Sequence, residues 1–215
     1  MDEIPLLQAP AFASFDHALI AAAFALIAET GWRRLSAADA ARRGGLDLAE
    51  ARQRFPSRLS ILLRFGSLAD QAALTGALVT GPVRDRLFDI VMRRIDALQT
   101  HRSGVIALLR ELPQDPLTLL ALAGPSARSA AWMLEGAGIP ATGLRGGLRT
   151  PGMMALWLAT VRAWQSDDSE DLSATMAALD NALNRASQAE ATMADVLGRT
   201  DSGIDPVAES IETPT

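Results

Sequence analysis

The chain has 215 residues, a formal net charge of −5 and no cysteine. The absence of cysteine excludes disulfide bonds, thiolate nucleophiles and zinc–thiolate sites. The length allows either one large domain or a small domain joined to a larger one. Alanine, leucine and arginine are abundant, tyrosine is absent, and strand-forming runs are missing, so the composition predicts an all-α fold.

Charge is distributed unevenly along the chain. Residues 10–66 hold eight arginines and five acidic residues, a balance of +3, whereas residues 67–215 hold twelve arginines and eighteen acidic residues, a balance of −6. A basic end on an acidic body is typical of a protein that contacts DNA with one end only.

The first third of the chain begins with an arm and a supporting helix. Residues 1–14 contain two prolines and predict a loose apolar arm. Apolar residues then recur at helical spacing from Phe15 to Ile27, and Gly31 stands where a helix C-terminus is expected. We therefore expect one helix between residue 15 and residue 30.

Two shorter helices follow, with a sharp turn between them. Ser36 is placed to cap a helix over residues 37–43. The glycine pair at 44–45 permits the positive φ angles of a tight turn, and Asp47 is placed to cap a helix over residues 48–55. This arrangement predicts a helix–turn–helix whose second helix reads DNA.

The segments 31–36, 40–46, 54–58 and 62–63 resemble the DNA-binding domain of TetR-family transcriptional regulators. The resemblance implies that Ser36 and Arg58, at the starts of the second and fourth helices, contact phosphates. It also implies a homodimer in which the last two long helices of each subunit form a four-helix interface. Arg52 stands where the family usually has an aromatic residue.

The expected DNA-binding domain covers residues 15–66 and is called the reading head below. Its resemblance to TetR-family domains predicts which side chains contact double-stranded DNA. Seven arginines lie within residues 33–58, and their mutual repulsion would be relieved by a phosphate backbone. We predict that Arg52, Gln53 and Arg54 lie closest to base edges and that Arg33, Arg34, Ser36 and Arg58 contact phosphates.

The remaining chain predicts a larger helical body over residues 67–198. A connecting helix is expected to begin at Ser57 and to end near residue 80. Further helices are expected at 82–100, 102–111, 117–135, from Thr150 to Trp164, and at 172–197, with a glycine-rich loop at 136–147. Residues 199–215 are polar and contain two prolines, which predicts a disordered tail.

Methionine and aromatic side chains of the body have the chemistry of an adaptable apolar pocket. The candidate ligand-binding residues are Phe88, Met92, Trp132, Met133, Met153, Met154 and Trp157. The alternative is that these side chains simply fill the core. Since TetR-type bodies commonly bind small effectors, the resemblance favours a pocket for a small apolar or lipid-like ligand.

A second resemblance leads to a different function. The segments 83–87, 101–102, 164–175 and 179–180 are similar to the accessory lipid-binding proteins of coenzyme Q (ubiquinone) biosynthesis, which share the TetR-like fold. This resemblance implies a protein that binds a lipid or a quinone precursor and whose helix–turn–helix is vestigial. A transcriptional regulator remains our first hypothesis, and the accessory protein is the alternative.

Catalytic groups are scarce. His17 and His101 are the only histidines, and neither a Gly-x-Ser-x-Gly elbow nor a phosphate-binding loop is present. We predict no enzyme activity, no cofactor and no metal site, since the acidic residues at 167–171 suit a helix start without a metal. His101, just after the helix expected to end at residue 100, is expected to interact with the C-terminus of that helix, and the alternative is a place by the ligand cavity.

The sequence also bears on cellular location. The longest apolar run, residues 18–28, is shorter than the roughly 20 residues that span a bilayer. The acidic first residues do not match a signal peptide. We expect a cytoplasmic protein without integral membrane association.

Overall fold

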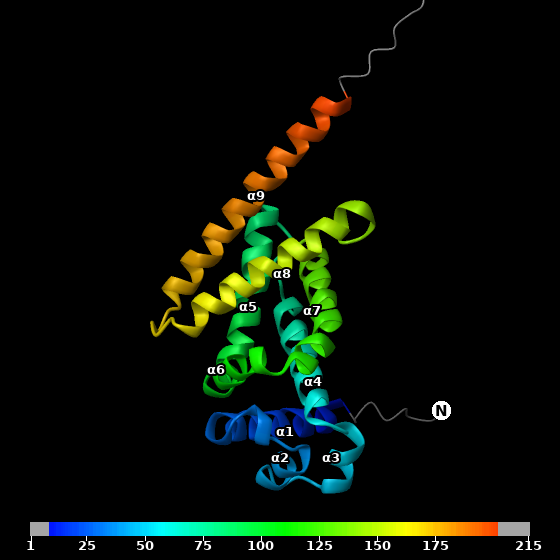
Figure 1. Ribbon diagram of the computed structural model, residues 1–215, viewed down its shortest axis with the longest axis vertical. Helices are drawn as coiled ribbons and strands as arrows, with labels where there is room; N and C mark the ends of the chain where they lie inside the picture. Colours follow the sequence, from blue (N-terminus) through cyan, green and yellow to red (C-terminus); the bar gives the residue numbers. More distant parts are fainter. Residues whose placement is uncertain (1–8, 202–215) are drawn as a thin grey trace, which may run out of the picture.

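The computed structural model describes residues 9–201, with side chains described for residues 14–143 and 146–189. All regular secondary structure among the described residues is helical, which confirms the predicted all-α class. Helices α1 (Ala9–Thr30), α2 (Ala37–Arg43) and α3 (Leu48–Arg54) form one end of the molecule, and α4 (Arg58–Leu74) leads away from them (Figure 1). A short 3-10 helix, η1 (Trp32–Arg34), joins α1 to α2.

The body contains five further helices and a second 3-10 turn. They are α5 (Val83–Gln99), α6 (Arg102–Glu111), η2 (Leu112–Gln114), α7 (Pro116–Gly136), α8 (Gly143–Gln165) and α9 (Ser173–Asp201). Helices α4, α5 and α7 run along the long axis, and α8 crosses them beside α9 (Figure 1). None of the helices in residues 9–201 is long and apolar enough to cross a membrane.

The predicted caps of the reading head are confirmed. The Ser36 hydroxyl accepts a hydrogen bond from the Asp39 amide at 3.0 Å, and Asp47 accepts one from the Glu50 amide at 2.7 Å. Ser57 and Ser60 form a reciprocal capping box at the start of α4. Because these signals are local, they fixed the starts of α2, α3 and α4 from sequence alone.

Several predicted boundaries are wrong. The expected arm extends too far, because α1 already begins at Ala9; Pro10 lies in the first turn, where a missing N–H costs nothing. Residues 1–8 of that arm lie outside the described chain. The connecting helix ends at Leu74 and not near residue 80, because the segment after it bonds to α5: the Leu78 amide donates to Asp89 at 3.2 Å.

The C-terminal boundaries also differ from the prediction. Helix α8 begins at Gly143, within the stretch expected to be a loop, and Thr150 lies inside the helix and does not cap it. Gly146 explains the error, since a Cβ there would lie 2.0 Å from the Ala141 carbonyl oxygen, so the glycine serves close packing and not a turn. Helix α9 continues to Asp201, and residues 202–215 of the predicted tail lie outside the described chain.

Buried apolar residues form two clusters. The first lies between helices α1, α2, α3 and α4 on one side and α5, α6 and the end of α8 on the other. It contains Trp32, Phe24, Phe55, Ile95 and Trp164. The second lies within the body, between α4, α5, α7, α8 and α9. Because the first cluster includes residues on both sides of position 66, the end formed by α1–α3 packs directly against the body.

Candidate nucleic-acid interface

Helix α3 is held in place by one buried carboxylate. Asp16 on α1 has a side chain that is only 5% exposed, and it accepts ion pairs from Arg54 on α3 at 2.7 Å and from Arg64 on α4 at 2.6 Å. Arg54 also pairs with Glu50 at 2.9 Å and lies over the Phe15 ring. These contacts join three helices, so they set the angle at which α3 faces its surroundings.

Three of the predicted DNA-binding side chains face solvent with their polar groups available. Arg34, Arg52 and Gln53 are exposed, and within residues 9–201 their side chains make no hydrogen bond or ion pair. Gln53 lines a shallow open depression on α3 together with Ala49, Glu50 and Arg54. Helix α3 therefore presents Arg52 and Gln53 outward while Arg54 turns inward.

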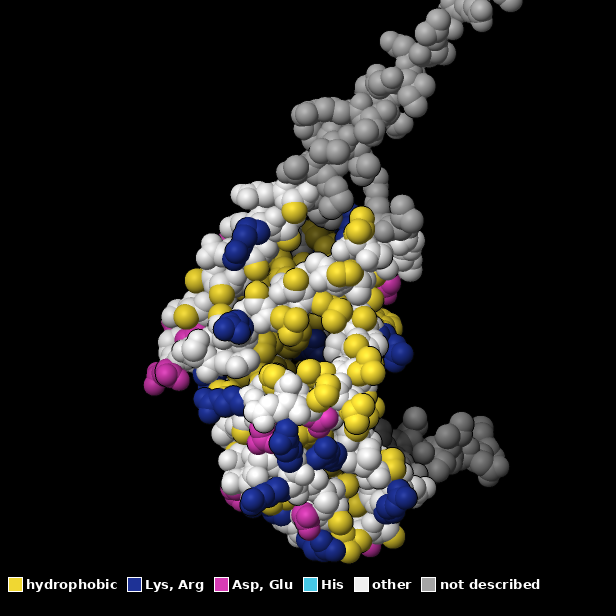
Figure 2. Space-filling model, viewed as in Figure 1, with side chains coloured by type: hydrophobic (Ala, Val, Ile, Leu, Met, Phe, Trp, Pro, Cys, Tyr) yellow, Lys and Arg dark blue, Asp and Glu magenta, His cyan; other side chains and the backbone are white. Residues whose placement is uncertain are grey.

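Other arginines around this end form exposed ion pairs. Arg42 pairs with Asp39 at 2.8 Å, and Arg43 pairs with Glu29 at 2.6 Å. The hydrogen bond from Arg43 lowers the pKa of Glu29. Figure 2 shows basic and acidic side chains mixed over the end formed by α1–α3. Exposed pairs of this kind add little stability, so these arginines can exchange their partners for phosphates.

Arg58 and Arg33, both predicted to contact phosphates, lie at the junction of the reading head with the body. Arg58 lies 4.8 Å above the Trp32 ring and pairs with Asp115 at 3.3 Å. The Trp32 indole donates to the same carboxylate at 3.1 Å, and Arg33 donates to the Gln114 carbonyl at 3.0 Å. Asp115 therefore connects the head to the start of α7.

Asp115 is also the N-terminal cap of α7. It accepts hydrogen bonds from the Thr118 hydroxyl at 2.8 Å and from the Thr118 amide at 3.1 Å. These bonds, together with that from Trp32, lower the pKa of Asp115. Sequence reasoning missed this residue, because a capping signal does not reveal contacts with residues 57 and 83 positions away.

Comparison with solved structures identifies the fold. The chain superposes on a TetR transcriptional regulator from Nitrosomonas europaea ATCC 19718 with a TM-score of 0.66 and 22% identity, over 81% of this chain and 99% of that one. The chain has the TetR fold. A TetR-family regulator from Streptomyces coelicolor matches with a TM-score of 0.57 and 17% identity, over 90% and 93% of the two chains.

A third structure extends the same result. The putative TetR-family regulator from Rhodococcus sp. matches with a TM-score of 0.56 and 16% identity, over 80% of this chain and 97% of the other. No protein-family model and no curated protein matches the sequence. The three superpositions thus cover nearly the whole length of the similar structures.

Helix α6 of the body packs against α1. Gly104 on α6 meets the Phe24 backbone, and His101, at the start of α6, stacks on the Phe24 ring with a centroid distance of 5.4 Å. His101 follows the end of α5, where its amide donates to the Leu98 carbonyl at 3.1 Å, and it is also the N-cap of α6. Burial lowers the pKa of His101, and the nearby His17 lowers it further.

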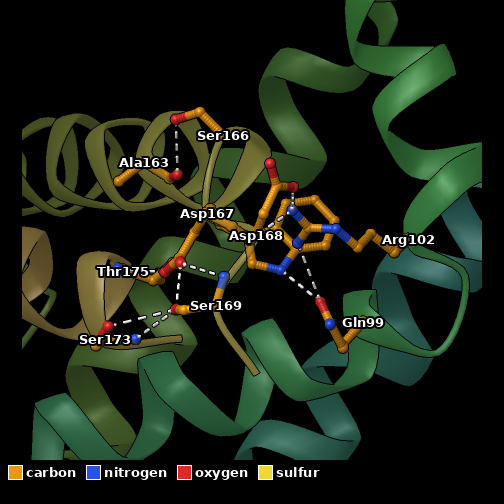
Figure 3. Close-up of polar contacts among 10 residues, drawn as sticks. Gln99, Arg102, Ala163, Ser166, Asp167, Asp168, Ser169, Ser173 and Thr175 are labelled. Carbon is orange, nitrogen blue, oxygen red and sulfur yellow. Dashed lines mark hydrogen bonds and ion pairs between the residues drawn. The ribbon is translucent and has the colours of Figure 1, made fainter. Parts of the chain in front are cut away.

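The turn between α8 and α9 is anchored on α5 and α6 (Figure 3). Asp167 accepts hydrogen bonds from the Thr175 amide at 2.7 Å and from the Thr175 hydroxyl at 2.6 Å. Arg102 donates to the Asp167 carbonyl at 2.8 Å and lies 4.8 Å above the Trp164 ring. The hydrogen bond from Ser169, followed by those from Thr175, strongly lowers the pKa of Asp167.

Most of the predicted ligand-binding residues meet in the second buried cluster. Phe88 and Met92 on α5, Met133 on α7, and Met153, Met154 and Trp157 on α8 belong to it or pack against it. Trp132 is the exception, because its side chain is 55% exposed and lies outside the cluster. Arg94, which sequence reasoning overlooked, is buried beside this cluster and lies over the Trp157 ring.

Proposed function

We propose that this protein is a dimeric TetR-type transcriptional regulator that reads DNA with α3 and binds a small apolar effector in its body. The proposal depends on how α3 is held and on which of its side chains it exposes. Its N-terminus is capped, its position is fixed through Asp16, and it presents Arg52 and Gln53 outward without intramolecular partners among the described residues. An exposed guanidinium and an exposed amide side by side on a fixed helix can form hydrogen bonds with base edges in a major groove.

The contacts of the seven candidate residues divide them into two groups. We assign base contacts to Arg52 and Gln53, and phosphate contacts to Arg34 and Ser36. Ser36 bonds only within its own helix start, to Asp39, whereas Arg33, Arg54 and Arg58 bond to other elements, so in the proposed function these three arginines orient the head and add to its positive potential.

The dimer in this proposal forms through α8 and α9. These helices pack on one another, and α8 exposes Leu148 and Leu158, each 62% accessible in the single chain. Exposed leucines on one helix pair fit a surface that a second copy covers. A two-fold dimer would present its two α3 helices to half-sites one helical turn apart, about 34–36 Å, or a multiple of that distance.

Fluorescence anisotropy on a labelled duplex from immediately upstream of the gene, compared with a scrambled duplex at several salt concentrations, tests the proposal. We expect preference for the native duplex and affinity that falls steeply with salt. Arg52→Ala should weaken native-duplex binding by roughly 5- to 150-fold, since a good base contact contributes about 1–3 kcal/mol. The control is Arg128→Ala, which removes an equal charge from an exposed site on α7.

The opposite result is equally clear. Equal weak binding to both duplexes, or an Arg52→Ala protein that binds like the Arg128→Ala control, would show that α3 does not read sequence. The accessory lipid-binding function would then be tested by extracting the purified protein with organic solvent and measuring bound isoprenoid or phospholipid per chain.

A further inference from the structure

Arg94 is a charged residue in an apolar setting. Among the described side chains it is the one arginine that is buried, with 8% of its surface exposed. Its neighbours along α5, Ile90, Val91 and Ile95, are fully buried hydrophobic residues. Burial lowers the pKa of Arg94, although a guanidinium remains protonated near neutral pH. A cation in such surroundings requires a partner of opposite charge.

The partner that the chain provides is incomplete. Arg94 pairs with Asp70 on α4 at 3.0 Å and donates to the Ser129 hydroxyl on α7 at 3.1 Å. The Ser129 hydroxyl in turn donates to Asp70. The Nε–H of Arg94 has no hydrogen-bond partner among the described residues, so one edge of a buried guanidinium remains unsatisfied.

The guanidinium is held flat against an aromatic ring, and its unpartnered Nε–H is buried. Its central carbon lies 4.4 Å from the centre of the Trp157 ring, and stacking of this kind fixes the plane of the fork. One Nη donates a weak hydrogen bond to the sulfur of Met133 at 4.0 Å, and this neutral acceptor provides no charge. A planar fork with a free Nε–H is shaped to donate two parallel hydrogen bonds to a carboxylate.

The face of the body drawn in Figure 2 is hollowed. Figure 2 shows the body hollowed between α7 and α8, with hydrophobic side chains around the opening and basic side-chain atoms inside it. Asp70 is also 23% exposed, so it can turn toward water when another anion takes its place. The apolar residues nearest this position, Met133 and Trp157, are among those predicted to line a pocket.

We propose that the body of this protein binds an apolar monocarboxylic acid, whose carboxylate replaces Asp70 on Arg94 while its hydrocarbon part occupies the hollow between α7 and α8. The proposal rests on the function above and names the class of its effector. A single negative charge is favoured, because one arginine neutralises one carboxylate, whereas a phosphate dianion beside Asp70 would keep an unpaired charge.

Displacement of Asp70 has a mechanical consequence. Asp70 lies on α4, and its two partners lie on α5 and α7. An acid that takes Arg94 therefore removes a polar connection between α4 and the body. Since α4 begins beside α3, the ligand acts on the helix that carries the reading head.

Isothermal titration calorimetry on the full chain without DNA tests the ligand class. Octanoate and 4-phenylbutyrate represent aliphatic and aromatic acids, while 1-octanol and 4-phenyl-1-butanol are their neutral counterparts. We expect at least one acid to bind once per chain, and to bind about 10- to 100-fold more tightly than its alcohol, because a charge-assisted hydrogen bond is lost in the alcohol. Octyl phosphate should bind more weakly than octanoate.

Two variants have opposite expected effects. Arg94→Gln should reduce the affinity for the acid to that of the alcohol, whereas Asp70→Asn should increase it, because the internal competitor loses its charge. Arg128→Ala, on the exposed face of α7, should change neither. Circular dichroism confirms folding of each variant, and Asp70→Asn retains the test if Arg94→Gln does not fold.

The proposal is overturned if neither acid binds, if acid and alcohol bind equally, or if Asp70→Asn weakens the acid. Each of these results is obtained without DNA and leaves the regulator proposal to the anisotropy experiment. Conversely, a protein that binds octanoate through Arg94 but does not prefer its native duplex would retain the ligand class and lose the regulatory function.

Discussion

The contact between α1 and α6 provides a sharp test of the fold, through Gly104→Ala. A Cβ at position 104 would lie 2.2 Å from the Phe24 carbonyl oxygen and 2.8 Å from its carbonyl carbon. Carbon–oxygen contacts in proteins are normally about 3.3–3.6 Å, so the helices would have to separate by about 1 Å. Both neighbours are backbone atoms, which cannot turn aside as a side chain does.

The expected magnitude follows from two opposing effects. Overpacking of this kind costs about 1–3 kcal/mol, and the severity of the backbone contact places it toward the upper end. Replacing a helical glycine with alanine recovers about 0.8–1 kcal/mol of helix propensity. We therefore expect a net loss of about 1–2 kcal/mol in the free energy of unfolding, or roughly 2–8 °C in Tm for a chain of this size.

The matched control is Gly66→Ala on α4, where an added Cβ meets no atom within 4 Å. It should stabilise the protein by up to about 1 kcal/mol, because the propensity gain acts alone. Urea unfolding followed by circular dichroism at 222 nm measures both variants. If Gly104→Ala were as stable as Gly66→Ala, the close approach of α6 to α1 would be absent and the argument wrong.

Three further changes test the polar contacts. Asp16→Asn should lower the free energy of unfolding by about 1–3 kcal/mol. This loss is smaller than the loss of a fully buried ion pair, because Arg54 and Arg64 are partly exposed. An unchanged urea midpoint would show that Asp16 does not fix α3. Asp167→Asn should lower Tm at pH 7. Since the pKa of Asp167 is depressed in the folded state, the difference in Tm between variant and wild type should shrink as pH falls below about 4. A Tm difference that stays constant with pH would contradict this expectation. The lowered pKa of His101 means that protonation disfavours the folded state, so stability should decline below about pH 6.5, and His101→Gln should reduce that decline when Tm is followed against pH.

The sequence predicted the reading head well because its signals are local. A hydroxyl or carboxylate three residues before a free amide defines a helix start without reference to the rest of the chain, as at Ser36 and Asp47. The start of α8 could not be predicted in this way. Gly146 lies close to the backbone of Ala141, and a local rule interprets the glycines of this stretch as a loop.

The roles of individual arginines depended on distant partners. Arg54 belongs to the same short helix as Arg52, and nothing in the local pattern indicates that Asp16, 38 positions earlier, turns one inward and leaves the other exposed. Arg94 shows the same limit, because an arginine on an amphipathic helix is ordinarily a solvated residue. Its partners Asp70 and Ser129 come from two other helices, so only the tertiary structure identifies the buried cluster.

Helices α4 and α7 are connected at two separate points. At the head, Arg58 near the start of α4 pairs with Asp115, which caps α7. In the body, Asp70 on α4 accepts from Ser129 on α7. The two α4 residues are twelve positions apart, or about 18 Å along the helix. An effector that breaks the polar contact in the body leaves the Arg58–Asp115 contact intact, so α4 keeps one polar link to α7 beside the apolar packing of the two helices.

This arrangement makes Asp115→Asn a test of coupling and not of binding. Coupling between two ligands is reciprocal, so operator DNA should weaken octanoate binding to the wild-type protein by the same factor as octanoate weakens DNA binding. In Asp115→Asn the DNA-free affinity for octanoate should be unchanged, because Asp115 lies at the head junction and outside the Arg94 cluster. The factor by which DNA alters that affinity should move toward one, as measured by octanoate titrations with and without duplex. An unaltered factor would mean that the signal reaches α3 by another route, such as the contact of α6 with Phe24 or the bond from Arg33 to Gln114.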